Sequence, residues 1–277
     1  ILIGLWNNWI RLYYHIYMDL EIKEENNTTL QIHNSANNLD KELASDIPEP
    51  LPSSTFCMII CGPSGSGKST SLYSIMTKRK KNKVRQSYRK VFDKIYIISP
   101  TMASASMKND PFKDIPKNQV YRSITLEGLT ELEEKVQENR EDGLNSVVIL
   151  DDVGSQLKKS KAIEKKLTQM IQNRRHDYCS YFILIQKFRD LQTGIRNNMS
   201  HFLFYKPKNQ IEKEAISNEL FPFKKHKFDQ LFNYVFENDD NFSFMFIDLS
   251  LKKTNKFIFH RKFNPLQITD NESGVVN

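Results

Sequence analysis

The sequence predicts an α/β domain in which a mostly parallel sheet is flanked by helices. Short apolar segments of strand type alternate with segments whose apolar residues recur at helical spacing, and this alternation favours parallel strands joined by right-handed crossovers. One segment, Val147-Val148-Ile149-Leu150, is apolar throughout, which is typical of a central strand covered on both faces. The 277 residues, 39% hydrophobic and 26% charged, suffice for one large domain with unstructured tails.

The individual elements follow from local patterns. After the first strand, Leu72, Ile75 and Met76 lie at helical spacing, and the second strand is stopped by Pro100. A charged helix then places Leu129, Leu132 and Val136 inward, and a later helix is basic and amphipathic. Strands are expected at 56–61, 94–99, around Val120, and at 147–150, 181–185, 201–205, 243–249 and 256–260. Helices are expected at 69–76, 126–140, 160–176, 211–220 and 226–237.

Residues 1–54 are expected to form a flexible leader before a folded domain at 55–265, and residues 266–277 a disordered tail. The stretch 21–54 is polar, rich in Asn, Glu and Ser, and ends in three prolines, so it buries little surface. Residues 1–17 are apolar but interrupted by polar side chains. They are interpreted as an upstream part of the reading frame, with translation starting at Met18, or alternatively as an amphipathic surface helix.

No membrane span or secretory signal is predicted, because the apolar N-terminal stretch is too short and too polar. The three cysteines Cys57, Cys61 and Cys179 form no CxxC pair and are interpreted as reduced thiols of an intracellular protein. The net charge of +7 and the pI near 9.1 favour an anionic partner such as nucleic acid.

The most specific motif is the G-x-x-x-x-G-K-[ST] pattern from Gly62 to Ser69. Its glycines allow the backbone N–H groups to surround phosphates, and the following helix adds its positive N-terminal end. Lys68 is expected to reach the β- and γ-phosphates of ATP, and the Ser69 hydroxyl to bind Mg²⁺. The predicted nucleotide-binding residues are Gly62, Pro63, Ser64, Gly65, Ser66, Gly67, Lys68, Ser69 and Thr70.

Two acids follow the central apolar strand. Carboxylates at the end of a buried strand are costly unless a charged group meets them there. We expect Asp151 to act on the Mg²⁺ side and Asp152 to orient or deprotonate the attacking water. The structural alternative is a turn aspartate or a helix N-cap. A water-activating acid indicates a hydrolase, and the sequence has no Asn-Lys-x-Asp guanine motif. ATP hydrolysis coupled to motion fits best.

Three further residues are candidates for the catalytic machinery. Gln186 ends the strand 181–185 and is expected to sense the γ-phosphate, unless it is simply the first loop residue. Arg174 and Arg175 precede that strand and are candidates for an arginine finger that acts on a neighbouring subunit. Alternatively they form a solvated helix end that interacts favourably with the helix dipole. Arg196 is a second candidate for the finger.

The order of these parts resembles the FtsK–HerA superfamily and, within it, the poxvirus-type genome-packaging ATPases of large DNA viruses and virophages. The resemblance covers about residues 50 to 265. It rests on the segments FCMIICGPSGSGKS (56–69), IYIISPT (95–101), VILDD (148–152), RRH (174–176), IQ (185–186) and IRNN (195–198). Two positions depart from the family pattern: Asp152 stands where many cellular members have glutamate, and Ile-Leu-Ile precedes Gln186 where a Ser or Thr is common.

The resemblance implies a RecA-like (ASCE) P-loop NTPase fold, and a homo-oligomeric ring, pentamer or hexamer, that drives double-stranded DNA into a preformed capsid. It also implies capsid proteins as partners, and a location in the viral factory of the host cell or in the virion. The expected DNA contacts are non-specific. Two basic stretches, at 78–90 and 158–166, either contact the phosphate backbone in a ring pore or are solvated faces. The alternative functions are a helicase or replication-loading ATPase, or a nucleotide-dependent switch or scaffold.

Overall fold

The computed structural model describes residues 41–77, 87–100, 112, 114–221, 224–237, 242–250, 258–270 and 274–275. The chain divides into two compact units, Ile1–Asn37 and Asn38–Asn277, and all described residues belong to the second. Most of the predicted leader, the first part of the basic stretch 78–90 and the end of the predicted tail therefore lie outside the described residues. No helix in the described ranges is long and apolar enough to cross a membrane.

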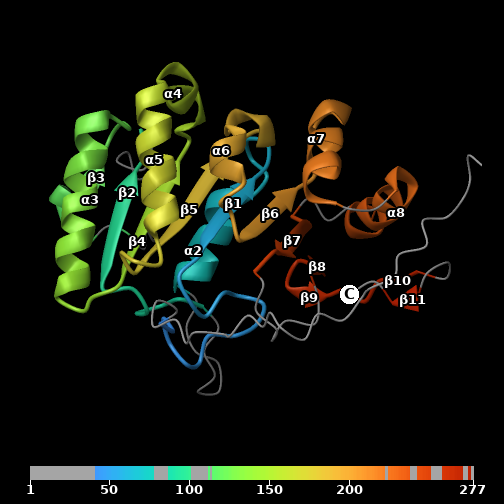
Figure 1. Cartoon of the computed structure of the whole chain (residues 1–277). Coiled ribbons are helices and arrows are strands. Elements are labelled where there is room, and N and C mark those ends of the chain that lie inside the picture. Colours follow the sequence, from blue (N-terminus) through green and yellow to red (C-terminus); the bar gives the residue numbers. More distant parts are fainter. Residues whose placement is uncertain are drawn as a thin grey trace, which may run out of the picture. The chain divides into compact units, whose positions relative to one another are not determined.

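A mixed sheet forms the centre of the second unit, in the order β3-β2-β4-β5-β1-β6-β7-β8-β9 (Figure 1). The six strands from β3 to β6 are parallel, and β7, β8 and β9 continue the sheet in antiparallel orientation. The prediction of a mostly parallel sheet is therefore confirmed. The strands are β1 (Cys57–Cys61), β2 (Lys94–Ile98), β3 (Val120–Tyr121), β4 (Ser146–Asp151), β5 (Cys179–Ile185), β6 (His201–Tyr205), β7 (Phe244–Asp248), β8 (Phe259–Arg261) and β9 (Asn264–Pro265). A separate antiparallel pair joins β10 (Thr269–Asp270) and β11 (Gly274–Val275).

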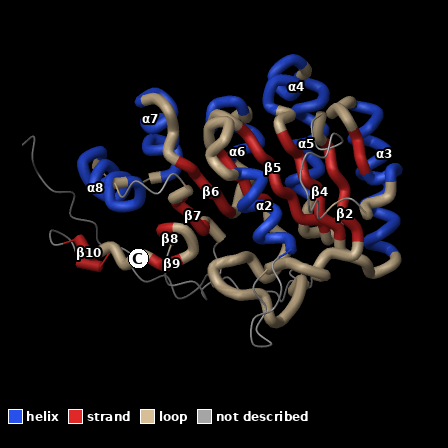
Figure 2. The backbone as a smooth tube through the Cα atoms, turned by 180° about the vertical axis from the view of Figure 1, so that it is seen from behind, coloured by secondary structure: helices blue, strands red, loops and turns tan. Residues whose placement is uncertain are grey.

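The helices cover both faces of the sheet (Figures 1 and 2). They are α2 (Lys68–Thr77), α3 (Leu126–Glu141), α4 (Gly154–Lys159), α5 (Lys161–Asn173), α6 (Thr193–Arg196), α7 (Gln210–Leu220) and α8 (Lys225–Phe236), and two short 3₁₀ helices span Lys117–Gln119 and Phe188–Asp190. Buried residues of α3, α5 and α8 share one core with alternate strand residues such as Ile59 and Ile183. Buried residues of α2 share the other core with Ile60 and Leu184. The alternation follows from the two-residue period of a strand.

Strand β5 separates β1 from β4. Ile60 of β1 lies opposite Leu184 of β5, and Leu150 of β4 lies opposite Ile183 on the other side of the same strand. All three strands are parallel, so their C-terminal ends meet at one edge of the sheet. The glycine-rich loop after β1 and the acids at the C-terminal end of β4 consequently face each other across the end of β5.

Part of the stretch assigned to the leader packs on the domain. Leu43 and Leu51 are buried in the same core as α2. The Tyr88 hydroxyl donates a hydrogen bond over 2.7 Å to the carbonyl of Pro52. Among the last described residues, Leu266 and Ile268 lie against the other core. Single apolar residues in a polar stretch give no periodic signal, so the composition alone suggested less order than the structure has at these positions.

Other elements differ in extent from the prediction, most clearly α5 and β5. The basic helix expected at 160–176 is α5, which begins after Ser160 and ends at Asn173. The Ser160 hydroxyl accepts a hydrogen bond from the backbone N–H of Ile163 and so caps the helix. The short helix α4 precedes it, and the strand expected at 181–185 begins at Cys179.

Candidate nucleotide-binding site

The glycine-rich loop connects β1 to α2. Gly65 and Gly67 have φ angles of 78° and 104°, which favour glycine over residues with a side chain. A Cβ atom added to Gly62 would lie 2.6 Å from Cβ of Tyr205 and 2.7 Å from the Ser66 hydroxyl, so the close approach of β6 excludes a larger residue there. The loop therefore has the conformation that its sequence predicts, with the first turn of α2 directed at the space above it.

Tyr205, at the end of β6, contacts this loop through its hydroxyl group. Its hydroxyl donates a hydrogen bond over 3.1 Å to the carbonyl of Gly67 and lies 2.5 Å from the Ser71 hydroxyl. Tyr205 is not among the residues that the sequence predicts for the site. No local signal could have identified it, because Tyr205 is separated from Gly67 by 138 positions and meets it only through the pairing of β6 with β1.

Lys68 is held by its own loop. Its ammonium group donates hydrogen bonds to the carbonyls of Gly62, at 2.7 Å, and Pro63, at 3.0 Å. Burial lowers the pKa of Lys68, and the nearby carboxylates of Asp151 and Asp152 oppose that shift. The positive charge is thus partly desolvated, which strengthens its attraction for an arriving phosphate.

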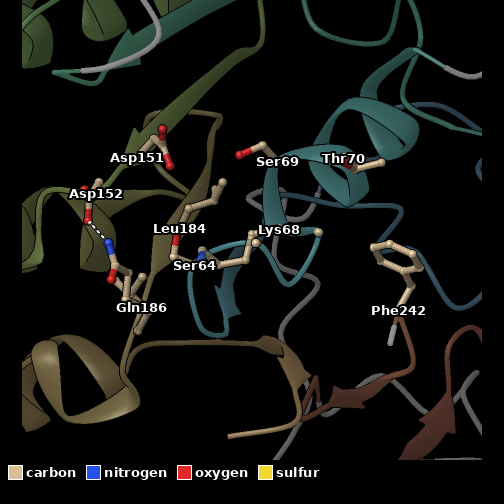
Figure 3. Close-up of a pocket in the computed structure, with 12 residues that line it drawn as sticks. Ser64, Lys68, Ser69, Thr70, Asp151, Asp152, Leu184, Gln186 and Phe242 are labelled. Atoms are coloured by element: carbon tan, nitrogen blue, oxygen red, sulfur yellow. Dashed lines mark hydrogen bonds between the residues drawn. The ribbon is translucent and has the colours of Figure 1, made fainter. Parts of the chain in front are cut away.

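The two acids have different surroundings. The Asp151 carboxylate accepts a hydrogen bond over 3.2 Å from the Ser99 hydroxyl at the end of β2. Asp152 is exposed and has φ of 55°, a left-handed conformation that aspartate adopts at low cost and that is often found at functional sites. Its carboxylate accepts a hydrogen bond over 3.2 Å from the side-chain amide of Gln186 (Figure 3).

These groups line a single pocket of about 370 Å³. In Figure 3, Ser69 and Asp151 face each other across the pocket, and Asp152 and Gln186 lie beside Asp151. Hydroxyl and carboxylate oxygens are ligands that Mg²⁺ prefers, usually together with waters and substrate phosphates. The Ser66 hydroxyl is buried and has no hydrogen-bond partner in the described part of the chain. The lining residues are Ser64, Gly65, Gly67, Lys68, Ser69, Thr70, Asp151, Asp152, Leu184, Ile185, Gln186 and Phe242.

The predicted arginine pair lies elsewhere. Arg174 and Arg175 precede β5, so they lie at the edge of the sheet where the parallel strands begin, opposite the pocket. Both line a second cavity of about 610 Å³ together with residues that precede β1 and β6. Arg174 donates a hydrogen bond over 3.1 Å to the carbonyl of Ile171. Within one chain, the structure does not bring these arginines to the phosphate loop.

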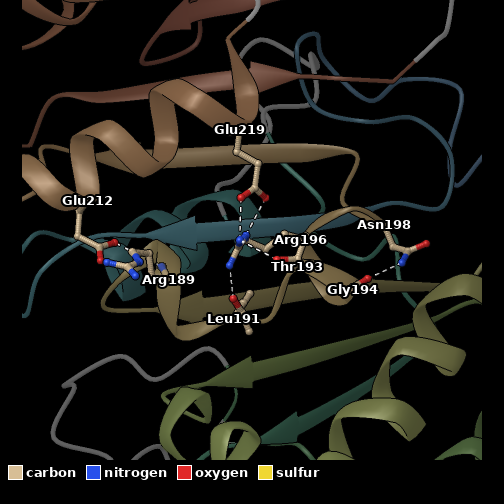
Figure 4. A network of polar contacts seen from close by, with 8 residues as sticks. All are labelled: Arg189, Leu191, Thr193, Gly194, Arg196, Asn198, Glu212 and Glu219. Carbon is tan, nitrogen blue, oxygen red and sulfur yellow. Dashed lines mark hydrogen bonds and ion pairs between the residues drawn. The ribbon is translucent and has the colours of Figure 1, made fainter.

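Arg196 is engaged inside the chain. Its guanidinium makes two contacts of 2.7 Å with the Glu219 carboxylate, one to each oxygen (Figure 4). It also donates a hydrogen bond to the carbonyl of Leu191 and lies 4.8 Å from the centre of the Phe188 ring. An arginine held in this way joins α6 to α7. Within the chain, Arg196 therefore has a structural role.

The structure also places the three cysteines and the second basic stretch. The cysteines Cys57, Cys61 and Cys179 are free and buried, and burial raises the pKa of each thiol. In the basic stretch 158–166, Lys158 contacts Asp190 at 2.6 Å and Lys166 pairs with Glu133. The remaining three lysines of that stretch, Lys159, Lys161 and Lys165, are exposed.

The family comparison agrees with this geometry. The family described as poxvirus A32 protein matches residues 48–236, which include the loop, both acids, Gln186 and the arginine pair. The chain belongs to the poxvirus A32 family. The predicted membership of the poxvirus-type packaging ATPases is confirmed. No curated protein sequence matches the chain.

Solved structures with the same fold include those of viral genome-packaging proteins. The packaging NTPase B204 of Sulfolobus turreted icosahedral virus 2, in complex with sulfate, has 14% identity and a TM-score of 0.51, covering 76% of this A32-family chain and 97% of B204. B204 of Sulfolobus turreted icosahedral virus, described as a DNA-packaging ATPase, has the same identity and TM-score over 76% and 98% of the two chains. At this identity the likeness shows a common fold, and it confirms the predicted P-loop ATPase architecture.

Proposed function

We propose that this chain hydrolyses ATP and uses the reaction to move double-stranded DNA into a viral capsid. The observation that carries the proposal is the convergence of Lys68, Asp151 and Asp152 on one pocket at the ends of β1 and β4. Membership of the A32 family supports the DNA-packaging role. Capsid proteins are the expected partners, and the viral factory or the virion the expected location.

Different residues of the pocket bind the phosphates and the metal ion. Lys68 leaves the carbonyls of Gly62 and Pro63 and binds the β- and γ-phosphates, while the loop N–H groups bind their remaining oxygens. Ser69 and Asp151 would hold a Mg²⁺ ion, which supplies positive charge at the phosphate oxygens. Ser99 keeps the Asp151 carboxylate in place through its hydrogen bond.

Asp152 acts on the attacking water. It accepts a proton from the water as the water oxygen forms its bond to the γ-phosphorus and the bond to the β–γ bridging oxygen breaks. Gln186 donates a hydrogen bond to Asp152, so it orients that carboxylate and loses its own partner when the carboxylate moves. This contact supports the role of Gln186 as a sensor of the γ-phosphate.

The arginines Arg174 and Arg175 complete the site of a neighbouring subunit in a ring of five or six copies. The arginines lie at the N-terminal ends of the parallel strands, and the phosphate loop lies at the C-terminal ends. This placement supports an action between subunits, in which the arginines of one subunit reach the phosphate loop of the next. Such head-to-tail contacts close into rings. Any positive charge brought to the γ-phosphate stabilises the transition state of its transfer.

The DNA contact is assigned to the exposed lysines Lys159, Lys161 and Lys165 of α4 and α5. The decisive experiment measures ATP turnover with duplexes of unrelated sequence and with single strands, over a range of salt concentrations. We expect similar stimulation by all duplexes, less by single strands, and a log–log salt slope of about −0.9 per phosphate contact.

A matched pair of triple variants tests the surface. Replacing Lys159, Lys161 and Lys165 by Gln should flatten the salt slope, whereas the same change at Lys117, Lys206 and Lys224, which are also exposed and lie outside both basic stretches, should leave it unchanged. Turnover that is indifferent to duplex DNA would favour a nucleotide-dependent switch. Stimulation only by forked DNA, with strand separation, would favour a helicase.

A further inference from the structure

Phe242 is an exposed aromatic residue in the wall of the nucleotide pocket. Its exposed fraction is 62%, whereas the next two residues, Ser243 and Phe244, are buried at 3% and 7%. It lies two residues before the start of β7, and its ring lies against the phosphate loop: a Cβ atom added to Gly67 would be 3.3 Å from Cδ1 of Phe242. The ring of Phe242 therefore gives this wall of the pocket an aromatic surface that an entering ligand can reach.

Tyr205 holds the start of β7 close to the phosphate loop. The ring of Phe244 packs edge-on against the ring of Tyr205, with 5.7 Å between their centres. Tyr205 in turn is hydrogen-bonded to the carbonyl of Gly67 and lies against the Ser71 hydroxyl. Because β6 and β7 are paired at Tyr205 and Phe244, the entry to β7 and the phosphate loop are held together.

The positions of the pocket residues predict how a bound nucleotide is oriented. This inference rests on the proposed function. Asp151 and Asp152 mark the end at which the γ-phosphate is attacked. Figure 3 shows Thr70 and Phe242 on the other side of Lys68 and Ser69 from these acids. A triphosphate bound along the first turn of α2 with its γ-phosphate toward the acids therefore directs its sugar and base toward Phe242.

We propose that Phe242 stacks on the base of the bound nucleoside triphosphate. Stacking uses the π-face that every base has, so the ring contributes affinity for a base without reading its hydrogen-bonding edge. A single stacked base is commonly bound about tenfold more tightly than when the aromatic residue is replaced by alanine. We expect purines, which have the larger ring system, to gain more from the contact than pyrimidines.

The test compares a nucleotide with its phosphates alone. The dissociation constants of ATP and of inorganic tripolyphosphate, both with Mg²⁺, are measured by calorimetry for the wild-type chain, Phe242→Ala and Phe242→Tyr. We expect Phe242→Ala to weaken ATP about tenfold and to leave tripolyphosphate unchanged. Phe242→Tyr keeps the ring and should bind both as the wild type does. Tyr234→Ala removes a ring of similar exposure, 58%, that does not line the pocket, and serves as the control.

Each other result would overturn the proposal. An equal loss of ATP and tripolyphosphate would mean that Phe242 only shapes the phosphate loop. Unchanged ATP binding by Phe242→Ala would mean that the base lies elsewhere. Unchanged ATP binding together with a smaller oligomer in light scattering would mean that the Phe242 side chain contacts a neighbouring subunit. The Lys68→Ala variant tests the proposed phosphate site independently of Phe242. If the wild type binds tripolyphosphate no better than Lys68→Ala does, the proposed phosphate site is wrong, whatever the result for Phe242.

Discussion

Gln186 and Asp152 meet at the ends of two neighbouring parallel strands, where the Gln186 side-chain nitrogen donates a hydrogen bond over 3.2 Å to Oδ1 of the aspartate. The two residues are 34 positions apart in the sequence, and the pairing of β4 with β5 brings them together. The contact links the residue that is proposed to activate water with the one that is proposed to sense the γ-phosphate.

Gln186→Ala is expected to lower kcat about tenfold, because Asp152 loses the partner that orients it, while KM for ATP changes little. Steady-state turnover of the purified protein measures both constants. Gln169→Ala, on the exposed side of α5, is the matched control. The combination of Gln186→Ala with Asp152→Asn should cost little more than Asp152→Asn alone, since both changes disable one unit. Fully additive losses would show that the two residues act separately.

Asp151→Asn and Asp152→Asn are expected to separate metal binding from hydrolysis. Asp152→Asn removes the proton acceptor and should reduce turnover by at least about a hundredfold while ATP still binds in the presence of Mg²⁺. Asp151→Asn should in addition weaken the Mg²⁺-dependent part of ATP binding. Fluorescent-nucleotide titrations with Mg²⁺ and with EDTA provide the measurement. Identical binding losses in the two variants would contradict this division of roles.

Mixing two inactive variants tests the action of Arg175 between subunits. Arg175→Ala keeps its own phosphate loop but cannot complete the neighbouring site, whereas Lys68→Ala supplies an intact Arg175. In randomly mixed rings, about a quarter of the interfaces combine an intact loop with an intact arginine, so some turnover should return. Native mass spectrometry must show mixed rings. Their complete inactivity would argue against a shared site, and the same mixture with Arg174→Ala would identify the more important arginine.

Stability is expected to depend on His260 in acid. Burial lowers the pKa of this histidine below its usual value of 6.5, although the nearby Asp248 opposes the shift. The unfolded chain therefore binds the proton more readily than the folded one, and the unfolding free energy should fall as the pH drops below about 6.5. Urea titrations at pH 7.5 and 5.5 measure this dependence. His260→Phe should reduce it, whereas His226→Gln, at an exposed position on α8, should not.

Sequence alone predicts the parts of the fold and the site that depend on neighbours along the chain. The glycine-rich loop, the apolar strand that ends in Asp151, and Gln186 after the next strand are all local patterns, and the pocket contains them as expected. Tyr205 and Phe242 have no such pattern, because their relation to the loop depends on the order of the strands. Arg196 was a candidate because of its charge, and only its partner Glu219 shows that it ties two helices together.

The arrangement of β5 has a consequence for how a ring of such subunits would operate. Strand β5 runs from Cys179 to Ile185, with Gln186 directly after it and the arginine pair in the turn before it, so its two ends lie about 20 Å apart. Both long edges of β5 are hydrogen-bonded, to β1 and to β4, so the strand cannot slide on its own. We therefore expect a displacement at one end to reach the other as a tilt of the whole sheet. Events at one nucleotide would then pass to the next by rigid rotation of entire subunits, which is a mechanical stroke and not a signal carried by side chains.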